Sequence, residues 1–177
     1  MARRFLTDGA TSVTLAALDE ETVGQAASAI GCEAEACDVT NEDQIVDLVD
    51  KVLARHGRID LFCSNAGATA GGGVLTDAPN DAWQRQWDLH VMAHIYAARA
   101  VLPSMIERGE GYLLNTASAA GLLAAIGSGP YSVTKAAAIK FARLARAMRG
   151  SLSSSPQPNP SSTEAMRESL ERIWQKR

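Results

Sequence analysis

Apolar positions along this chain follow two rhythms, one typical of buried strands and one typical of amphipathic helices. Four short apolar runs predict strands at residues 12–18, 32–39, 59–64 and 112–117. Between them apolar residues recur every three or four positions, as Ile45, Leu48, Val49, Val52 and Leu53 do. Strand and helix alternate four times, which predicts an α/β protein with a parallel sheet and helices on both faces.

Residues suited to helix ends mark where the predicted helices begin. Asp19 is expected to cap the helix after the first strand, and Thr40 or Asn41 the helix after the second. A long helix is predicted over residues 80–108, with Pro103 bending or restarting it.

The composition changes abruptly after residue 150, which divides the chain into three parts. Residues 1–150 form the α/β domain. Residues 151–163 are rich in Ser and Pro and predict a flexible linker. Residues 164–177 predict an amphipathic helix with one apolar stripe, made of Met166, Leu170, Ile173 and Trp174. We expect this stripe to dock on the chain's own body or to fray, in preference to forming a functional site.

Composition and charge exclude several classes of partner. The chain has 177 residues, 46% hydrophobic and 21% charged, which is enough for one soluble domain with a sizeable core. A net charge of -3 gives no electrostatic case for nucleic acid or an anionic membrane. No apolar run approaches a bilayer span, and the first ten residues lack the apolar core of a signal peptide. We therefore expect a cytoplasmic protein with no nucleic-acid and no membrane partner.

No metal site is expected. His90 and His94 stand four apart and would share one face of a helix, but no Glu follows the first histidine as a zinc-protease helix requires. The cysteines Cys32, Cys37 and Cys63 show no zinc-type spacing, and we interpret them as reduced thiols.

Candidate chemistry gathers between Tyr112 and Lys135. Tyr131 and Lys135 stand four apart, so a helix running to about residue 149 would place the phenol and the ammonium on one face. A nearby ammonium favours the phenolate form of a tyrosine, which makes proton transfer feasible near neutral pH. Ser118, thirteen residues before Tyr131, could hydrogen-bond a carbonyl or alcohol oxygen.

The pair alone is a weak signal, because a buried tyrosine and a lysine on an ordinary amphipathic helix have the same spacing. Other motifs accompany it in a fixed order: CDVT (37–40), SNAG (64–67), Ser118 and YSVTK (131–135). Together they make residues 1–149 resemble the short-chain dehydrogenase/reductase family. The resemblance implies a Rossmann-like fold and a nicotinamide cofactor.

The resemblance also implies roles in catalysis. Tyr131 is the general acid/base, and Lys135 assists it and binds the nicotinamide ribose. Ser118 orients the substrate oxygen. His90 occupies the place of an asparagine that helps hold the proton relay in the family, and imidazole can also donate and accept hydrogen bonds.

Cofactor-binding residues follow from the same resemblance. Asp38 and Val39 would flank the adenine, and the segment Asn65, Ala66 and Gly67 would line the ribose and phosphate side, together with Tyr131 and Lys135. The alternative for this segment is a plain turn after a strand, since Asn and Gly form turns readily. Ala17 stands where an acidic residue commonly selects NAD, and Asp19 is two residues on, so NAD and NADP both stay open.

The resemblance is incomplete at both ends. Family members open with a strand and a glycine-rich turn that receives the cofactor pyrophosphate, whereas Met1 here already lies in the helix after that turn. We therefore expect a doubly wound parallel sheet that lacks the first strand with its Gly-rich loop and the last strands. The strands that end near Leu18 and Ser64 would then either pair directly or leave backbone groups unpaired.

Two functions are compatible with these observations. The first is an NAD(P)-dependent oxidoreductase that transfers hydride between the cofactor and a small-molecule alcohol or carbonyl substrate. The second is a truncated, catalytically silent relative that acts only in association. By the family resemblance, the long helix and the Tyr131 helix also build subunit contacts, which implies a homo-oligomer.

Overall fold

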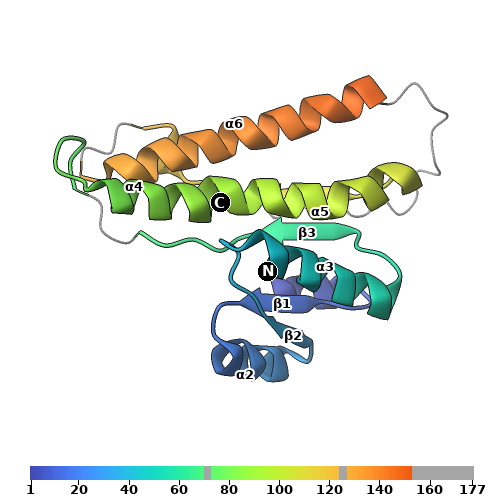
Figure 1. The fold of residues 1–177 in the computed structure, drawn as a ribbon. Helices are drawn as coiled ribbons and strands as arrows, with labels where there is room; N and C mark the ends of the chain where they lie inside the picture. Colours follow the sequence, from blue (N-terminus) through green and yellow to red (C-terminus); the bar gives the residue numbers. More distant parts are fainter. Residues whose placement is uncertain (70–72, 124–126, 153–177) are drawn as a thin grey trace.

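Helices and strands alternate along the chain in the order expected from its apolar pattern (Figure 1). The computed structural model describes residues 1–69, 73–123 and 127–152. The elements are α1 (Ala2–Thr7), β1 (Thr14–Ala17), α2 (Glu20–Ile30), β2 (Glu33–Ala36), α3 (Glu42–His56), β3 (Leu61–Ser64), α4 (Asn80–Trp87), the π-helical turn η1 (Asp88–Met92), α5 (Ala93–Arg108), β4 (Tyr112–Asn115), the 3-10 turn η2 (Ala119–Gly121) and α6 (Gly129–Leu152).

Local capping explains where α2 and α3 begin and end. The side chain of Asp19 accepts a hydrogen bond from the first turn of α2. Asn41, not Thr40, does the same for α3. Gly31 and Gly57 end these helices with φ values of 78° and 75°, a conformation that costs glycine little because it has no Cβ.

The four strands form two parallel pairs. β1 lies beside β2, with Thr14 opposite Glu33, and β3 lies beside β4, with Leu61 opposite Tyr112. Within the described residues, β1 and β3 do not pair with each other. The direct pairing considered for the strands ending near Leu18 and Ser64 is therefore absent among the described residues.

Apolar side chains join the two strand pairs. Cys37 at the end of β2 packs with Ile45 and Leu48 of α3, and Phe62 of β3 and Tyr96 of α5 pack against this cluster. A second cluster extends it along α3 and α5 and contains Val49, Val101 and Met105. The helix α3 therefore holds both strand pairs in one core, which supplies the burial that stabilises the fold.

The long predicted helix is interrupted at a different place from the one expected. A bend or a restart was expected at Pro103; α5 runs through Pro103 without a break, so the restart is wrong. The irregularity is η1, five residues in a π-helical turn between α4 and α5. Such turns widen a helix locally and are frequent at functional sites. Here η1 carries His90.

The predicted linker and C-terminal helix fall almost entirely on residues 153–177, outside the described residues. Residues 151 and 152, the first two of the predicted linker, belong to α6.

Among the described residues, no helix has the length and apolar character needed to span a bilayer.

Candidate functional site

The candidate site lies where β3 and β4 end. Because these strands are parallel and adjacent, the residues that follow them meet at one edge. Asn65 follows β3 and Thr116 lies just beyond β4, and the Thr116 hydroxyl donates a hydrogen bond of 2.8 Å to Asn65 Oδ1. This bond ties the SNAG segment to the neighbouring strand.

α6 brings Tyr131 and Lys135 to this edge. Lys135 is 3% exposed, and its Nζ donates a hydrogen bond of 3.0 Å to the backbone oxygen of Thr116. The same Nζ lies 5.7 Å from the centroid of the Tyr131 ring. Burial lowers the pKa of Lys135 from its ordinary value. The Tyr131 phenol and the Lys135 ammonium therefore lie close together, as the four-residue spacing predicts.

A pocket of about 290 Å³ opens between these elements. Its lining contains polar and small residues from both strand ends and from α6: Asn65, Gly67, Ala68, Thr69, Thr116, Ala117, Tyr131 and Lys135. Small ligands bind in concave sites with a few convergent polar groups. The pocket is therefore the candidate binding site.

Two glycines allow the walls of this site to approach closely. A Cβ on Gly67 would lie 3.3 Å from His90 Nε2 and 3.5 Å from Lys135 Nζ. A Cβ on Gly121 would lie only 2.6 Å from the backbone carbon of Lys135. Gly121 thus lets η2 pack directly on the turn of α6 that carries Lys135.

Ser118 lies at the start of η2, beside the pocket-lining Ala117. Its Oγ accepts a hydrogen bond of 3.2 Å from the N–H of Ala120, which caps η2. The side chain is half-buried and is not part of the pocket lining described above. Ser118 therefore lies near the end of α6 that carries Tyr131 and Lys135. In this structure its hydroxyl caps η2.

His90 lies behind the pocket and is fully buried. Its Nε2 accepts a hydrogen bond of 3.3 Å from the N–H of Ala68, and its Nδ1 lies 3.1 Å from Thr134 Oγ1. Its ring meets the Tyr131 ring edge to face at 5.3 Å. Burial, with the Lys135 charge, lowers the pKa of His90 to about 4.

His94 lies deeper along the same helix. It stacks on Phe141 at 6.2 Å, and burial lowers its pKa to about 4. In the described part of the chain, no three His, Cys, Asp or Glu side chains are grouped as metal ligands. Cys32, Cys37 and Cys63 are free thiols.

The CDVT segment lies apart from the pocket lining, after β2 in the other strand pair. Asp38 Oδ1 accepts hydrogen bonds from the N–H and hydroxyl of Thr40, and Val39 packs against the Cys37 cluster. Both residues stand at the carboxyl end of a parallel strand, as the SNAG segment does. Ala66 is exposed within that segment.

Sequence reasoning missed three polar residues of the site: Thr116, Thr134 and Gln86. Thr134 lies between Tyr131 and Lys135 in the YSVTK motif, and Thr116 lies within the predicted fourth strand, one residue before its end. Gln86 stands four residues before His90, a spacing that places both on one helix face. That spacing was the available signal for Gln86.

An α/β chain with parallel strands and a site at their carboxyl ends has the arrangement of Rossmann-like nucleotide-binding proteins. The family model described as short chain dehydrogenase matches residues 1–151. The chain therefore belongs to the short-chain dehydrogenase family, and the resemblance drawn from its motifs is confirmed.

Individual relatives agree with this assignment. An oxidoreductase of Staphylococcus saprophyticus is 30% identical over 138 residues, which cover 75% of this chain and 58% of the relative. The dehydrogenase/reductase SDR family member 4 of Oryctolagus cuniculus is 33% identical over 144 residues, 78% of this chain and 55% of the relative. The chain thus spans little more than half the length of these relatives.

Solved structures confirm the Rossmann-like fold class. NAD+-bound xylitol dehydrogenase has a TM-score of 0.78 and 29% identity, over 85% of this chain and 60% of that one. A metagenomic short-chain oxidoreductase in complex with NADP has a TM-score of 0.77 and 29% identity, over 85% of this chain and 71% of that one.

Proposed function

We propose that this chain carries the acid/base part of an NAD(P)-dependent oxidoreductase that transfers hydride between the cofactor and an alcohol or carbonyl group of a small molecule. One observation supports this most directly: Tyr131 and the buried Lys135 line the same pocket at the carboxyl ends of β3 and β4. Family membership supplies the reaction class, and two structural relatives hold NAD+ and NADP.

The residues present fit a nicotinamide nucleotide. The bare Cα of Gly67 leaves the backbone close to Lys135 and His90, where a side chain would crowd the wall. Lys135, Asn65 and Thr116 offer a cation and hydrogen-bonding groups of the kind that hold ribose hydroxyls. Asp38 and Val39, after β2, would hold the adenine side. The cofactor would supply the hydride acceptor or donor.

The proton chemistry falls to this chain's own side chains. Tyr131 would give its phenolic proton to a carbonyl oxygen, or take one from an alcohol, as hydride moves. The Lys135 ammonium stabilises the phenolate left behind, because opposite charges attract strongly where water is excluded. Ser118 would orient the substrate oxygen, in exchange for its bond to the Ala120 N–H.

A fluorescence titration with NADH and NADPH tests this proposal. We expect the protein to bind at least one of them, and Lys135→Met to weaken that binding at least about tenfold through loss of a buried charged partner. Lys140→Met, an exposed lysine on the same helix, is the matched control and should bind normally. If neither nucleotide binds at millimolar concentration, the enzyme proposal is wrong, and the catalytically silent alternative is favoured.

A further inference from the structure

Ala68, one residue beyond the SNAG segment, is held through both of its backbone groups. Gln86 Nε2 donates a hydrogen bond of 3.1 Å to the Ala68 oxygen. The Ala68 N–H donates to His90 Nε2 at 3.3 Å. Gln86 and His90 are 3% and 0% exposed. Burying two polar side chains costs free energy unless each is hydrogen-bonded, so their bonds to one residue call for a reason.

The hydrogen bonds of His90 define its tautomer. Nε2 accepts from the Ala68 N–H, so Nε2 carries no proton, and the proton of the neutral ring lies on Nδ1. The Thr134 hydroxyl donates its single proton to the backbone oxygen of Pro130 or Tyr131, which leaves its lone pairs to accept from His90 Nδ1–H. Both ring nitrogens are therefore occupied.

This imidazole joins two walls of the pocket. On one side it holds Ala68, which lines the pocket beside Gly67. On the other it holds Thr134, which lies on α6 between Tyr131 and Lys135. The separation between the loop after β3 and the proton-transferring side chains therefore depends on one ring, and Gln86 adds a second bond to the loop.

We propose that Gln86 and His90 form a clamp that positions residues 65–69 against α6. His90 acts through Ala68 and Thr134 as a positioning residue and takes no part in proton transfer. Its consequence for catalysis rests on the proposed oxidoreductase function. The clamp itself is a feature of the fold and does not depend on the proposed function.

The charge state of His90 agrees with this assignment. A relay residue must exchange protons near the working pH. Burial and the Lys135 charge hold the pKa of His90 at about 4, and a second ring proton would point at the Ala68 N–H, a donor facing a donor. The neutral ring is therefore the state that fits its surroundings.

Two substitutions of His90 separate its two bonds. Glutamine reaches about as far as Nε2 and can still accept from the Ala68 N–H, whereas asparagine reaches only about as far as Nδ1. We expect the Ala68 amide to exchange hydrogen roughly tenfold faster in His90→Asn than in the unaltered protein, and at a near-normal rate in His90→Gln. Hydrogen exchange of a peptide spanning residues 65–69 measures this directly.

Gln86→Met tests the second bond with little change of volume. The matched control is Gln84→Met, because Gln84 is exposed on the same helix and bonds only locally to Asp88. We expect faster exchange over residues 65–69 in the first variant alone. If Gln86→Met and His90→Asn both leave this exchange unchanged while unfolding cooperatively, there is no clamp.

Activity and nitrogen NMR separate positioning from proton transfer. For an active enzyme we expect His90→Asn mainly to raise the cofactor KM, since the loop wall moves, and His90→Gln, which keeps the bond to the Ala68 N–H, to raise it less. A nitrogen NMR spectrum at pH 7 should show His90 protonated on Nδ1 and not on Nε2. An imidazolium or an Nε2–H tautomer would overturn the proposal. If the unaltered protein binds no nucleotide, the proposed function fails, yet exchange and NMR still decide whether the clamp exists.

Discussion

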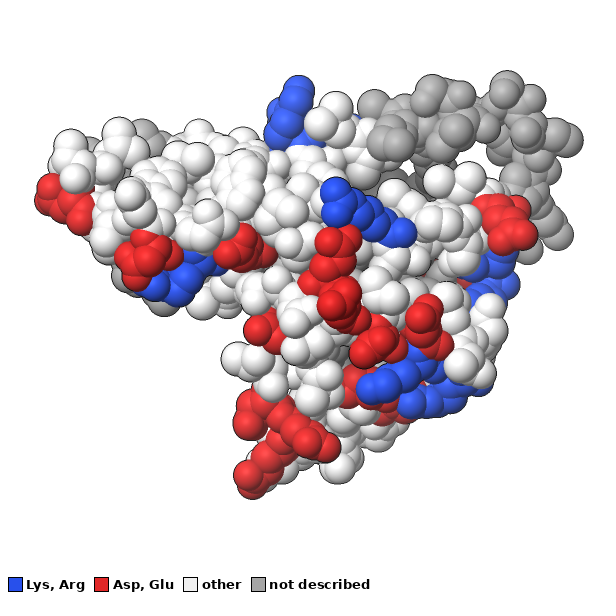
Figure 2. Space-filling model, viewed as in Figure 1, with Lys and Arg blue, Asp and Glu red and all other residues white. Residues whose placement is uncertain are grey.

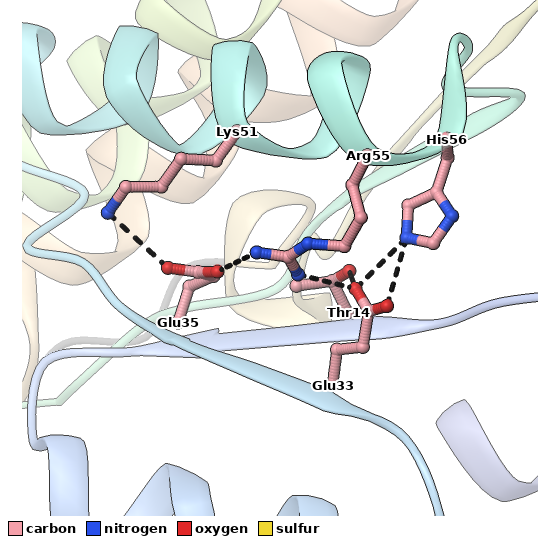
Figure 3. A network of polar contacts seen from close by, with 6 residues as sticks. All are labelled: Thr14, Glu33, Glu35, Lys51, Arg55 and His56. Atoms are coloured by element: carbon pink, nitrogen blue, oxygen red, sulfur yellow. Dashed lines mark hydrogen bonds and ion pairs between the residues drawn. The ribbon is translucent and has the colours of Figure 1, made fainter.

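Two polar networks of this protein use similar groups in opposite surroundings. The ion-pair network joins Thr14, Glu33 and Glu35 of the β1–β2 pair to Lys51, Arg55 and His56 of α3 (Figure 3). Arg55 lies 2.7 Å from each of the two glutamates. The pocket network consists of Gln86, His90, Thr134 and Lys135, all buried. Figure 2 shows charged side chains gathered over the region of α2 and α3, whereas the part of α6 that lies over α4 carries few.

The two networks shift protonation in opposite senses. In the ion-pair network, hydrogen bonds from His56 and Arg55 lower the pKa of Glu33 to about 2, so the charged form is favoured. In the pocket network, burial lowers the pKa of His90 to about 4, so its neutral ring is favoured, and burial also lowers the pKa of Lys135 from its ordinary value. Exposure to water decides the difference, because a desolvated charge needs a partner of opposite sign and the pocket network has none. The first network holds α3 in place, while the second shapes a site.

Tyr131→Phe is expected to have the largest effect. It removes the proposed proton carrier and keeps the ring, so turnover should fall by about 10² to 10⁴ or more with little loss of stability. Steady-state assays with thermal unfolding measure both. Tyr96→Phe, the same substitution on a tyrosine of the α5 core, should leave turnover unchanged. Full activity in Tyr131→Phe would reject the assigned acid/base.

Acid should destabilise the two networks in different pH windows. The folded-state pKa values of His90 and His94 lie near 4, below their ordinary value of 6.5, so the unfolded state binds more protons between these values. Stability should therefore be complete above about pH 6.5 and fall below it, by up to about 1.4 kcal/mol per pH unit for each histidine. The contribution of Glu33 should be lost only below its ordinary value of 4.5.

Denaturant unfolding between pH 7 and 4 checks this order. His94→Phe should roughly halve the slope between pH 6.5 and 4.5, because it removes one of the two titrating rings. Phenylalanine should fit there, since the His94 nitrogens have no hydrogen-bond partner among the described residues and the ring already stacks on Phe141. A free energy of unfolding that does not change across this range would contradict the buried, neutral state of both histidines.

Gly121→Ala tests how tightly the pocket side is packed. The added Cβ would lie 2.6 Å and 2.7 Å from backbone atoms of Lys135 and Ala136, so η2 or α6 must shift, at a cost of about 1 to 3 kcal/mol. Gly127→Ala is the control, since no atom among the described residues lies within 4 Å of a Cβ there. Equal melting temperatures for the two variants would show that the close approach of η2 to α6 is not required.

Arg55→Gln is expected to have the smallest effect, because exposed ion pairs contribute little. The melting temperature should fall by about 1 to 4 °C at low salt, and the difference should shrink at 1 M salt as screening weakens the pairs. Arg85→Gln removes a more exposed pair with Asp81 within one helix and should change less. A loss that persists at high salt would mean that Arg55 acts through packing.

Much of the secondary structure could be predicted from the local sequence, because strand periodicity and helix caps depend on neighbouring residues. The four predicted strands and the cap at Asp19 are present. The interruption of the long helix was misplaced, since proline is a strong local signal whereas the π-helical turn around His90 has no local signature. The role expected for His90 came from the family resemblance, and its partners Ala68 and Thr134 were not visible in the sequence.

The amino-acid sequence by itself determined the alternation of elements, the family, and the identity of the phenol and ammonium four residues apart. Only the tertiary structure decided that Lys135 bonds to the backbone of Thr116, that Gln86 and His90 both hold Ala68, and that β1 and β3 stay apart. The physical reason is the separation along the sequence between the residues that interact. Capping and periodicity act over a few residues, whereas these contacts join segments far apart in the chain, and their geometry follows from how helices pack over strand ends.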